Sequence, residues 1–352
     1  MTLHIFNPEH DIALASDLSN FTSPHAGRQL RYDLGWLPAL WAEDGDAILV
    51  DNPELAERSW LRIAGRLKRN TSAGSKLFLA PHQLGTHPCF SHISPWGWDK
   101  ALKAQLLRNG INKDLLPSDN QLRDIREMSH RRVSSTLLSQ LRFAGTVGES
   151  FECQDAPTAI SLLNRYGHVV MKAPWSSSGR GIRFVKEQML QEGWLHNLIS
   201  RQGSVMVEPY YNKVKDFGME FYSNGQGTVS YLGLSLFHTE NGAYTGNILA
   251  TEERKMEMIT HYISPNLIGT VQERICDVLA EELEGKYCGP LGVDMMVVSN
   301  NDQFMLHPCV EINLRRTMGH VALALSPTDE DIQQVMRIEY ANNNYKLRFK
   351  RL

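Results

Sequence analysis

Carboxylate and amide side chains recur within two neighbouring apolar stretches near the end of the sequence. The first stretch contains Asp294, and the second ends in Glu311 and Asn313, with Arg315 following closely. Because side chains alternate across a strand, Glu311 and Asn313 point to the same face. An unpaired carboxylate inside an apolar stretch is costly unless a cation accompanies it. The group indicates a magnesium ion that bridges phosphate groups, although each residue alone is typical of a solvated strand end.

A lysine followed by a turn rich in glycine and serine lies in the middle of the sequence. The apolar stretch 167–172 ends in Lys172 and runs into the turn 173–181, APWSSSGRG. Successive backbone N–H groups of such a turn can bind an anion, and the lysine adds a point charge. A P-loop is excluded, because the turn lacks G-x-x-x-x-G-K-[ST] and leads into another strand. The alternative interpretation is an ordinary flexible hairpin.

The segment 204–223 has the pattern of a strand, a connection and a returning strand. Glu208 ends the first strand, Asp216 ends the connection, and Glu220 lies within the second strand. A purine can lie against the apolar side chains here, bind the backbone near residues 206–208, and place its ribose hydroxyls against a carboxylate. The alternative is a solvated hairpin loop.

The first part of the chain predicts a layer of parallel strands that positions further polar residues. Strands are expected at 3–6, 47–50 and 76–80, with helical patterns such as 53–69 between them. This alternation is typical of an α/β domain. Loops after such strands carry ligands, which makes Asn7, His10 and Asp11 candidate site residues. Alternatively, His10 and Asp11 cap the helix that begins next to them.

The remaining patterns complete the expected organisation. We expect a loop at 84–98, helices at 100–109 and 118–141, paired strands at 292–298 and 303–312, and a helix and strand within 326–352. A domain boundary is predicted near residue 120. No internal repeat is visible.

Bulk properties restrict the class of protein. The chain has 352 residues and a formal net charge of −3, which gives no reason to expect nucleic acid or an acidic membrane as partner. Its first residues lack a basic leader with an apolar core, so no secretory signal is predicted. The 5 cysteines are odd in number and scattered, which argues against a disulfide framework or a zinc site. We therefore expect a reduced, cytoplasmic protein.

In their order, these elements resemble the ATP-grasp family, which includes D-alanine–D-alanine ligase, glutathione synthetase and biotin carboxylase. The similarity extends from about residue 131 to 320 and is most specific at VEINLRR, which resembles the E-x-N-x-R pattern of the family. It implies a mixed α/β and α+β protein with an N-terminal α/β domain before a two-lobed ATP-grasp module. The expected parts are residues 1–120, a small lobe with a phosphate lid at 121–203, and a large lobe with the nucleotide hinge and metal site at 204–352.

The resemblance also implies roles for residues. Asp294, Glu311 and Asn313 would bind magnesium, or manganese in its place, and Arg315 and Lys172 would act in catalysis. The residues expected to bind ATP are Arg132 (or its neighbour Arg131), Lys172, Ser176, Ser177, Ser178, Gly179, Gly181, Met206, Val207, Glu208, Asp216 and Glu220.

The expected activity is ATP-dependent activation of a carboxylate as an acyl phosphate, followed by attack of an amine. The alternatives are a small-molecule kinase of the same fold, or a nucleotide-binding regulatory protein without turnover. The expected partners are small carboxylates and amines, without nucleic acid or membrane, and family members are often dimers. Candidates for the acceptor site are the loop 7–11, Arg28, Arg31, and His238, Glu240, Asn241 and Tyr244 in the stretch 231–244.

Overall fold

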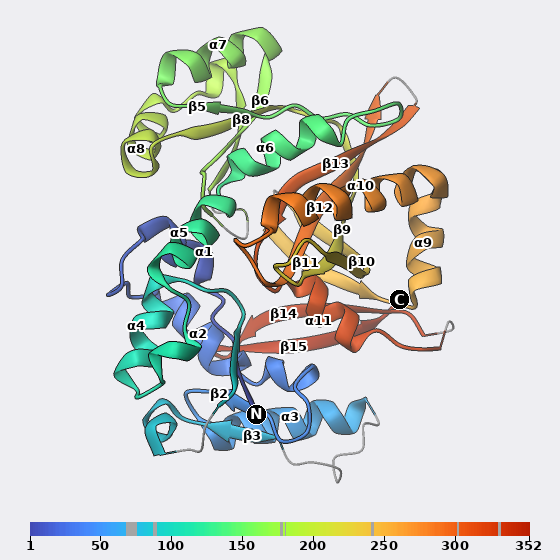
Figure 1. The fold of residues 1–352 in the computed structure, drawn as a ribbon. Helices are drawn as coiled ribbons and strands as arrows, with labels where there is room; N and C mark the ends of the chain where they lie inside the picture. Colours follow the sequence, from blue (N-terminus) through green and yellow to red (C-terminus); the bar gives the residue numbers. More distant parts are fainter. Residues whose placement is uncertain are drawn as a thin grey trace.

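The computed structural model contains three β-sheets, each with helices packed against it (Figure 1). It describes residues 1–67, 76–86, 90–176, 179, 181–240, 243–300, 303–329 and 332–352. Within these residues no helix is long and apolar enough to cross a membrane. The mixed architecture agrees with the fold class predicted from the sequence. The cytoplasmic location and the dimer stay predictions.

The N-terminal domain is built on a parallel sheet with strand order β3-β2-β1-β4. Its strands are β1 (Thr2–Ile5), β2 (Ala47–Leu49), β3 (Leu77–Leu79) and β4 (His92–Pro95). The helices beside it are α1 (His10–Ser16), α2 (His25–Leu34), α3 (Pro53–Arg66) and α4 (Lys100–Arg108). Three strands lie where the sequence predicted them. The fourth lies within the predicted loop 84–98, and its terminal proline is tolerated because β4 is an edge strand.

The predicted helix 118–141 is two helices, α5 (Asp119–Met128) and α6 (Arg131–Gln140). The chain is extended at His130, with φ −72° and ψ 133°, and the ring of His130 caps α6 by accepting a hydrogen bond from the backbone of Arg132. The break therefore makes Arg131 the first residue of a helix that packs against the large sheet.

The small lobe is an antiparallel sheet with strand order β5-β8-β6-β7. It contains β5 (Phe151–Cys153), β6 (His168–Lys172), β7 (Ile182–Lys186) and β8 (Val205–Pro209), with helices α7 (Ala156–Tyr166) and α8 (Glu192–Gln202) packed on it. Because β8 pairs with both β5 and β6, this sheet extends past the predicted lobe limit at residue 203.

The large sheet is antiparallel, with strand order β13-β12-β9-β10-β11-β14-β15. Its strands are β9 (Lys213–Ser223), β10 (Val229–Glu240), β11 (Ala243–Leu249), β12 (Gly289–Asn300), β13 (Gln303–Asn313), β14 (Gln334–Ala341) and β15 (Asn344–Arg351). The accompanying helices are α9 (Glu252–Thr260), α10 (Pro265–Leu283) and α11 (Met318–Leu325). Apolar side chains of α6 and α10 join those of the central strands in one core.

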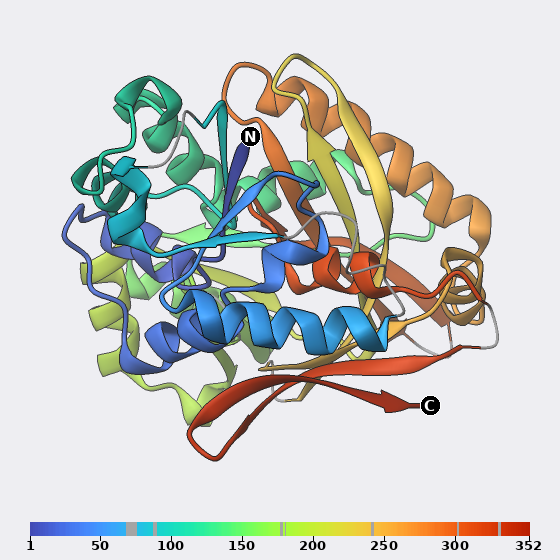
Figure 2. The ribbon, with the colours of Figure 1, turned by 90° about the horizontal axis from the view of Figure 1, so that it is seen from below.

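The C-terminal segment is a β-hairpin, so the helix predicted within residues 326–352 is wrong. Asn342 and Asn343 have φ of 53° and 61° between β14 and β15, a conformation that favours asparagine in tight hairpin turns. The hairpin lies beside the N-terminal helices (Figure 2), where β15 contacts α2 and the guanidinium of Arg66 lies over the ring of Phe349. The C-terminal hairpin thus packs against helices of the N-terminal domain.

Candidate active site

Alternation along β9 places two predicted carboxylates on one face of the large sheet. Phe217, Met219 and Phe221 are fully buried in the core beneath the sheet. Asp216 and Glu220 point the other way and line a cavity of about 780 Å³. This is the period of two expected of a strand with one apolar and one polar face.

The neighbouring strands continue the polar face. Asp294 on β12 lies opposite Glu311 on β13, and Gly292 lies opposite both Asn313 and Glu220. A Cβ at Gly292 would lie 2.7 Å from Glu220 Oε2, so the glycine leaves room for the carboxylate. The residues predicted to bind metal therefore share one face with Glu220.

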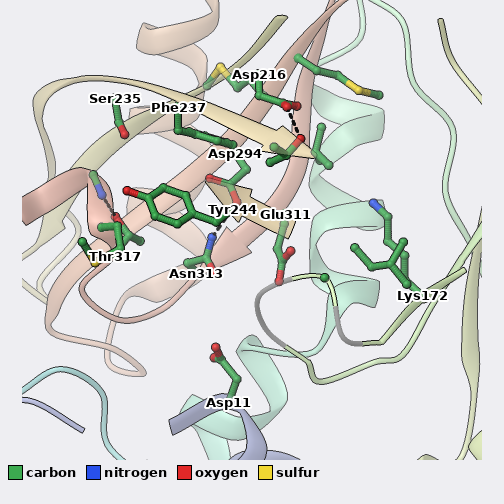
Figure 3. A pocket seen from close by; sticks show the side chains of 18 of the residues that line it. Asp11, Lys172, Asp216, Ser235, Phe237, Tyr244, Asp294, Glu311, Asn313 and Thr317 are labelled. Carbon is green, nitrogen blue, oxygen red and sulfur yellow. Dashed lines mark hydrogen bonds between the residues drawn. The ribbon is translucent and has the colours of Figure 1, made fainter. Parts of the chain in front are cut away.

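The cavity lies where the three parts of the molecule meet (Figure 3). Lys172 reaches it from the small lobe, whereas Asp294, Glu311 and Asn313 come from the large sheet and Asp11 from the N-terminal domain. Its volume is within the range of about 300–1,000 Å³ that is typical of ligand pockets. The cavity is therefore large enough for a small-molecule ligand.

The oxygen ligands fit a magnesium ion that also binds phosphate. Burial, together with the nearby Glu311 and Glu220, raises the pKa of Asp294 to about 8. A cation would offset this cost. The described residues contain no group of three or more His, Cys, Asp or Glu placed to hold a metal. Two carboxylates and the amide of Asn313 would therefore need phosphate oxygens to complete the shell, as Mg²⁺ commonly does.

Arg315 is held by a carboxylate of the N-terminal domain. Its Nε lies 2.9 Å and 3.0 Å from the two carboxylate oxygens of Asp11, and its Nη2 lies 2.8 Å from Asp11 Oδ2. The same Nη2 donates to Asn313 Oδ1 at 2.8 Å. Burial raises the pKa of Asp11, but the charge and hydrogen bond of Arg315, together with the charges of His10 and Arg131, outweigh burial and lower that pKa. Asp11 thus fixes the arginine beside the candidate metal ligand.

Lys172 forms an ion pair with Glu208 inside the cavity, with 2.7 Å between Nζ and Oε2. Both side chains are almost fully buried, and they lie on the adjacent strands β6 and β8. Lys172 lines the cavity, but its charge is already balanced by Glu208. Glu208 is the residue predicted to lie near the adenine.

Of the two neighbouring arginines predicted as alternatives for an ATP contact, Arg131 lines the cavity and Arg132 does not. Arg131 lines the cavity, donating to Glu311 Oε1 at 2.7 Å and to Ser176 Oγ at 2.8 Å. Arg132 pairs with Glu127 outside the cavity. Since α6 begins at Arg131, the first arginine faces the sheet and the second faces solvent.

The predicted phosphate lid is described only in part. Gly179 lines the cavity and has φ +74°, and Ala173 N donates to Gly181 O at 2.8 Å, which closes the turn. A Cβ at Gly181 would lie 2.5 Å from Ser176 Oγ, so the glycine permits this close packing. Ser177, Ser178 and Arg180 lie outside the described residues.

The segment predicted to be the nucleotide hinge lines the cavity from residue 208 onward. Met206 and Val207 are fully buried, and their strand pairs on both sides, so neither lines the cavity. The hinge residues that do are Glu208, Pro209, Tyr210 and Tyr211. Asp216 also lines the cavity, where its Oδ2 accepts hydrogen bonds from Lys213 at 2.6 Å and Thr239 at 2.5 Å.

An aromatic group beside the hinge was not predicted. The rings of His168 and Tyr210 are stacked with centroids 3.9 Å apart, and Phe184 contacts Tyr210 edge-on at 6.2 Å. All three line the cavity and offer flat surfaces to a purine. Alternation contained the signal, because His168 on β6 must share a face with Lys172.

Only some of the residues predicted for the acceptor site line the cavity. Asp11 and Tyr244 line the cavity, whereas the side chains of Asn7, His10, Arg28, Arg31 and His238 do not. Asn7 and the two arginines line a smaller hollow in the N-terminal domain, and His10 Nδ1 lies 3.5 Å from Asp99 Oδ2. Asn241 and the side chain of Glu240 lie outside the described residues. Glu220, predicted to contact ATP, also lines the cavity, where its carboxylate accepts a hydrogen bond from Thr317 and lies beside His320.

The fold is similar to those of several solved structures. No protein-family model and no curated protein matches the sequence. Biotin carboxylase from Campylobacter jejuni, solved as a β-γ-ATP complex, is 13% identical, with a TM-score of 0.54 over 97% of this chain and 77% of that chain. N5-carboxyaminoimidazole synthetase from Staphylococcus aureus, complexed with ADP, is 12% identical, with a TM-score of 0.53 over 97% and 83%.

A third solved structure, from Archaeoglobus fulgidus and described as an ATP-grasp superfamily protein, is similar along its whole length. It is 14% identical, with a TM-score of 0.51 over 100% of this chain and 99% of that chain. These similarities and the order of the three sheets confirm the fold that VEINLRR and the preceding elements predicted. The chain has the ATP-grasp fold.

Proposed function

We propose that this protein is a magnesium- and ATP-dependent ligase that activates a carboxylate as an acyl phosphate and joins it to an amine. The observation that carries the proposal is the convergence of Asp294, Glu311, Asn313 and Arg315 on a cavity that Lys172 enters from the opposite side. Similarity to structures solved with ADP or an ATP analogue supports the nucleotide part.

Asp294, Glu311 and Asn313 are the residues that would hold the metal. When bound, Mg²⁺ supplies positive charge that stabilises the phosphoryl group in transfer. Glu311 uses one oxygen for Arg131, and the amide oxygen of Asn313 accepts from Arg315, so each keeps acceptor capacity for an ion. The residues present therefore fit this role.

The chain's own contribution is mostly positioning and charge. Lys172 and Arg131 would contact the phosphates after exchanging their carboxylate partners for phosphate oxygens. Arg315 would contact the transferred phosphoryl group while Asp11 keeps its guanidinium in place. Fixed cations of this kind act mainly by stabilising charge that develops in the transition state. No covalent protein nucleophile is needed.

The lining next to the hinge would bind the base and ribose. His168, Phe184 and Tyr210 provide an aromatic surface for the purine. Asp216 lies further along the cavity, where its carboxylate is held by Lys213 and Thr239. The nucleotide would then extend from the small lobe towards Asp294, with its triphosphate between the two sheets.

The test is a screen of small carboxylates and amines in pairs, with ATP and Mg²⁺, for release of ADP. A ligase should release ADP only when both partners are present and should form an amide detectable by mass spectrometry. A stable phosphorylated product without an amide would indicate a kinase. Tight binding of MgATP without ADP release from any pair would favour a nucleotide-binding regulatory protein and overturn the proposal.

A further inference from the structure

The end of the cavity furthest from the nucleotide hinge is apolar. Phe6, Leu30, Trp96, Met318 and Ile338 all line it, and all belong to or pack against one apolar cluster. The rings of Phe6 and Trp96 meet edge-on with centroids 4.9 Å apart. We call this surface the apolar wall. It joins segments from the N-terminal domain, helix α11 and the C-terminal hairpin.

A buried carboxylate lies next to the apolar wall. Glu220 is 2% exposed, and its Oε2 accepts from Thr317 Oγ1 at 2.8 Å and lies 2.9 Å from His320 Nδ1. A Cβ at Gly319 would lie 1.8 Å from Glu220 Oε1 and 2.6 Å from Ser235 Oγ. The glycine therefore allows the chain to pass close to the carboxylate, and Oε2 is the oxygen that the neighbouring side chains fix.

A chain of hydrogen bonds continues this polar edge. Asn247 Nδ2 donates to Ser235 Oγ at 2.9 Å, and Tyr244 donates to Asn247 Oδ1. Ser235, Tyr244 and Asn247 all line the cavity. Because Ser235 already accepts one bond, its hydroxyl proton can be donated to a ligand or to Glu220.

The cavity offers no free cation for a second anionic group. Every lysine and arginine that lines it within the described residues has a carboxylate partner: Arg131 with Glu311, Lys172 with Glu208, Lys213 with Asp216, and Arg315 with Asp11. By contrast, no lysine or arginine among the described residues lies within ion-pair distance of Glu220. An acceptor with its own carboxylate or phosphate would find no partner at this end.

We propose that this end binds the amine substrate, a molecule with an ammonium group and an aromatic or branched apolar group but without a carboxylate beside the amine. The apolar wall would hold the apolar group, and Glu220 would bind the nitrogen. This inference rests on the ligase function proposed above, and it names the class of the second substrate and the residue that takes its proton.

Formation of the amide changes two bonds at the acyl carbon. The uncharged amine attacks the acyl carbon, a carbon–nitrogen bond forms, and the bond from that carbon to the phosphate oxygen breaks. Inorganic phosphate leaves with the electron pair of that bond. The bound ammonium first passes one proton to Glu220, which releases it to solvent, and the second proton, which the nitrogen loses on acylation, leaves on the inorganic phosphate. No oxidant or further reactant is needed.

Three probes with the same ring test the charge preference: 2-phenylethylamine, phenylalanine and 3-phenylpropionate. Calorimetry on the full chain with saturating MgADP should show 2-phenylethylamine binding about tenfold or more tightly than the other two, because only it lacks a carboxylate facing Glu220. Ethylamine should bind about tenfold more weakly than 2-phenylethylamine, because it cannot fill the apolar wall. Equal affinities, or a preference for the anion, would overturn the proposal.

Variants separate the two parts of the site. Glu220→Gln keeps the shape of the side chain and should remove the preference for the amine without weakening 3-phenylpropionate. Ile338→Asn should weaken the binding of 2-phenylethylamine but not that of ethylamine. Ile332 is exposed and does not line the cavity, so Ile332→Asn should change the binding of neither amine. Retention of the full preference in Glu220→Gln would contradict the assignment.

Failure of this inference can be told from failure of the proposed function. If MgADP binds and the amine does not prefer this end, only the substrate class is wrong. If MgADP itself does not bind, the nucleotide site fails first. With a productive carboxylate in hand, Glu220→Gln should lower the rate of amide formation and shift its dependence on pH.

Discussion

The two ends of the cavity differ in how they treat charge. At the nucleotide end, Lys172, Arg131 and Lys213 are each balanced by a carboxylate before any ligand binds. At the other end, the apolar wall lies beside Glu220, whose bonding partners are Thr317 and His320. In the proposed function, the first end exchanges protein carboxylates for phosphate oxygens on binding the nucleotide. The second end can select a ligand by shape and by a single charge.

The largest expected effect comes from the nucleotide end. Glu311→Ala or Lys172→Ala should lower ADP release roughly 10²- to 10³-fold, because each removes a charge aimed at the phosphates. Steady-state ADP release measures the loss. Glu281→Ala and Lys286→Ala remove similar charges from exposed positions outside the cavity and serve as matched controls.

Both active-site variants should keep the circular dichroism spectrum of the unchanged protein. Full ATP turnover in both would mean that the charged end is not the site of phosphoryl transfer. The proposed division of the cavity into a nucleotide end and an apolar end would then be wrong.

The second effect tests the ion pair of Asp11 and Arg315, which joins the N-terminal domain to the end of strand β13. Asp11→Ala leaves the largely buried Arg315 guanidinium with only neutral oxygen partners. Loss of one partner of a buried pair should lower the free energy of unfolding by about 3 kcal/mol. Chemical denaturation measures this change, and the activity should fall because Arg315 is no longer fixed.

A double-mutant cycle with Asp11→Ala and Arg315→Ala isolates the pair. We expect an interaction energy of about 1 kcal/mol or more between the two residues. Additive changes would show that the N-terminal domain does not position the arginine.

The third effect is a dependence of metal binding on pH. Asp294 has a folded pKa of about 8, against about 4 in an unfolded chain. Between these values the folded protein binds a proton that the unfolded chain has lost, so the free energy of unfolding should fall as the pH rises through this window. Mg²⁺ must displace the same proton. Its affinity should therefore rise about tenfold per pH unit up to pH 8 and then level off.

Calorimetry of Mg²⁺ with ADP present, at several pH values, measures this slope. Asp294→Asn should remove the slope together with much of the affinity. A Mg²⁺ affinity that does not change between pH 6 and pH 8 in the unchanged protein would place the ion elsewhere.

The smallest expected effect concerns the aromatic surface at the hinge. Tyr210→Ala should raise the Kd of ATP about fivefold, because one stacking surface for the purine is lost. Tyr210→Phe keeps the ring and should bind ATP normally. Equal binding by all three proteins, measured by calorimetry, would show that the base lies away from this surface.

The sequence could predict the site residues that depend on strand alternation. Glu311 and Asn313 share a face because the period of a strand is two, and no tertiary contact is needed to see it. Arg131 was harder to assign, since its direction depends on the helix break at His130. The pattern of residues 118–141 was consistent with one continuous helix.

Contacts between distant segments could not be predicted in the same way. Asp11 and Arg315 meet because the N-terminal domain packs beside the large sheet. The apolar wall needs Phe6 and Ile338 from opposite ends of the chain, and Ile338 lies in a hairpin that the sequence pattern did not indicate. Such residues carry no local signal, because only the folded arrangement brings them together.

The most direct test is a crystal structure with a non-hydrolysable ATP analogue and Mn²⁺. The account predicts an anomalous Mn²⁺ peak bounded by Asp294, Glu311 and Asn313, with the triphosphate extending towards Lys172. A Mn²⁺ peak at another position, or an analogue bound without any ion between these residues, would contradict it.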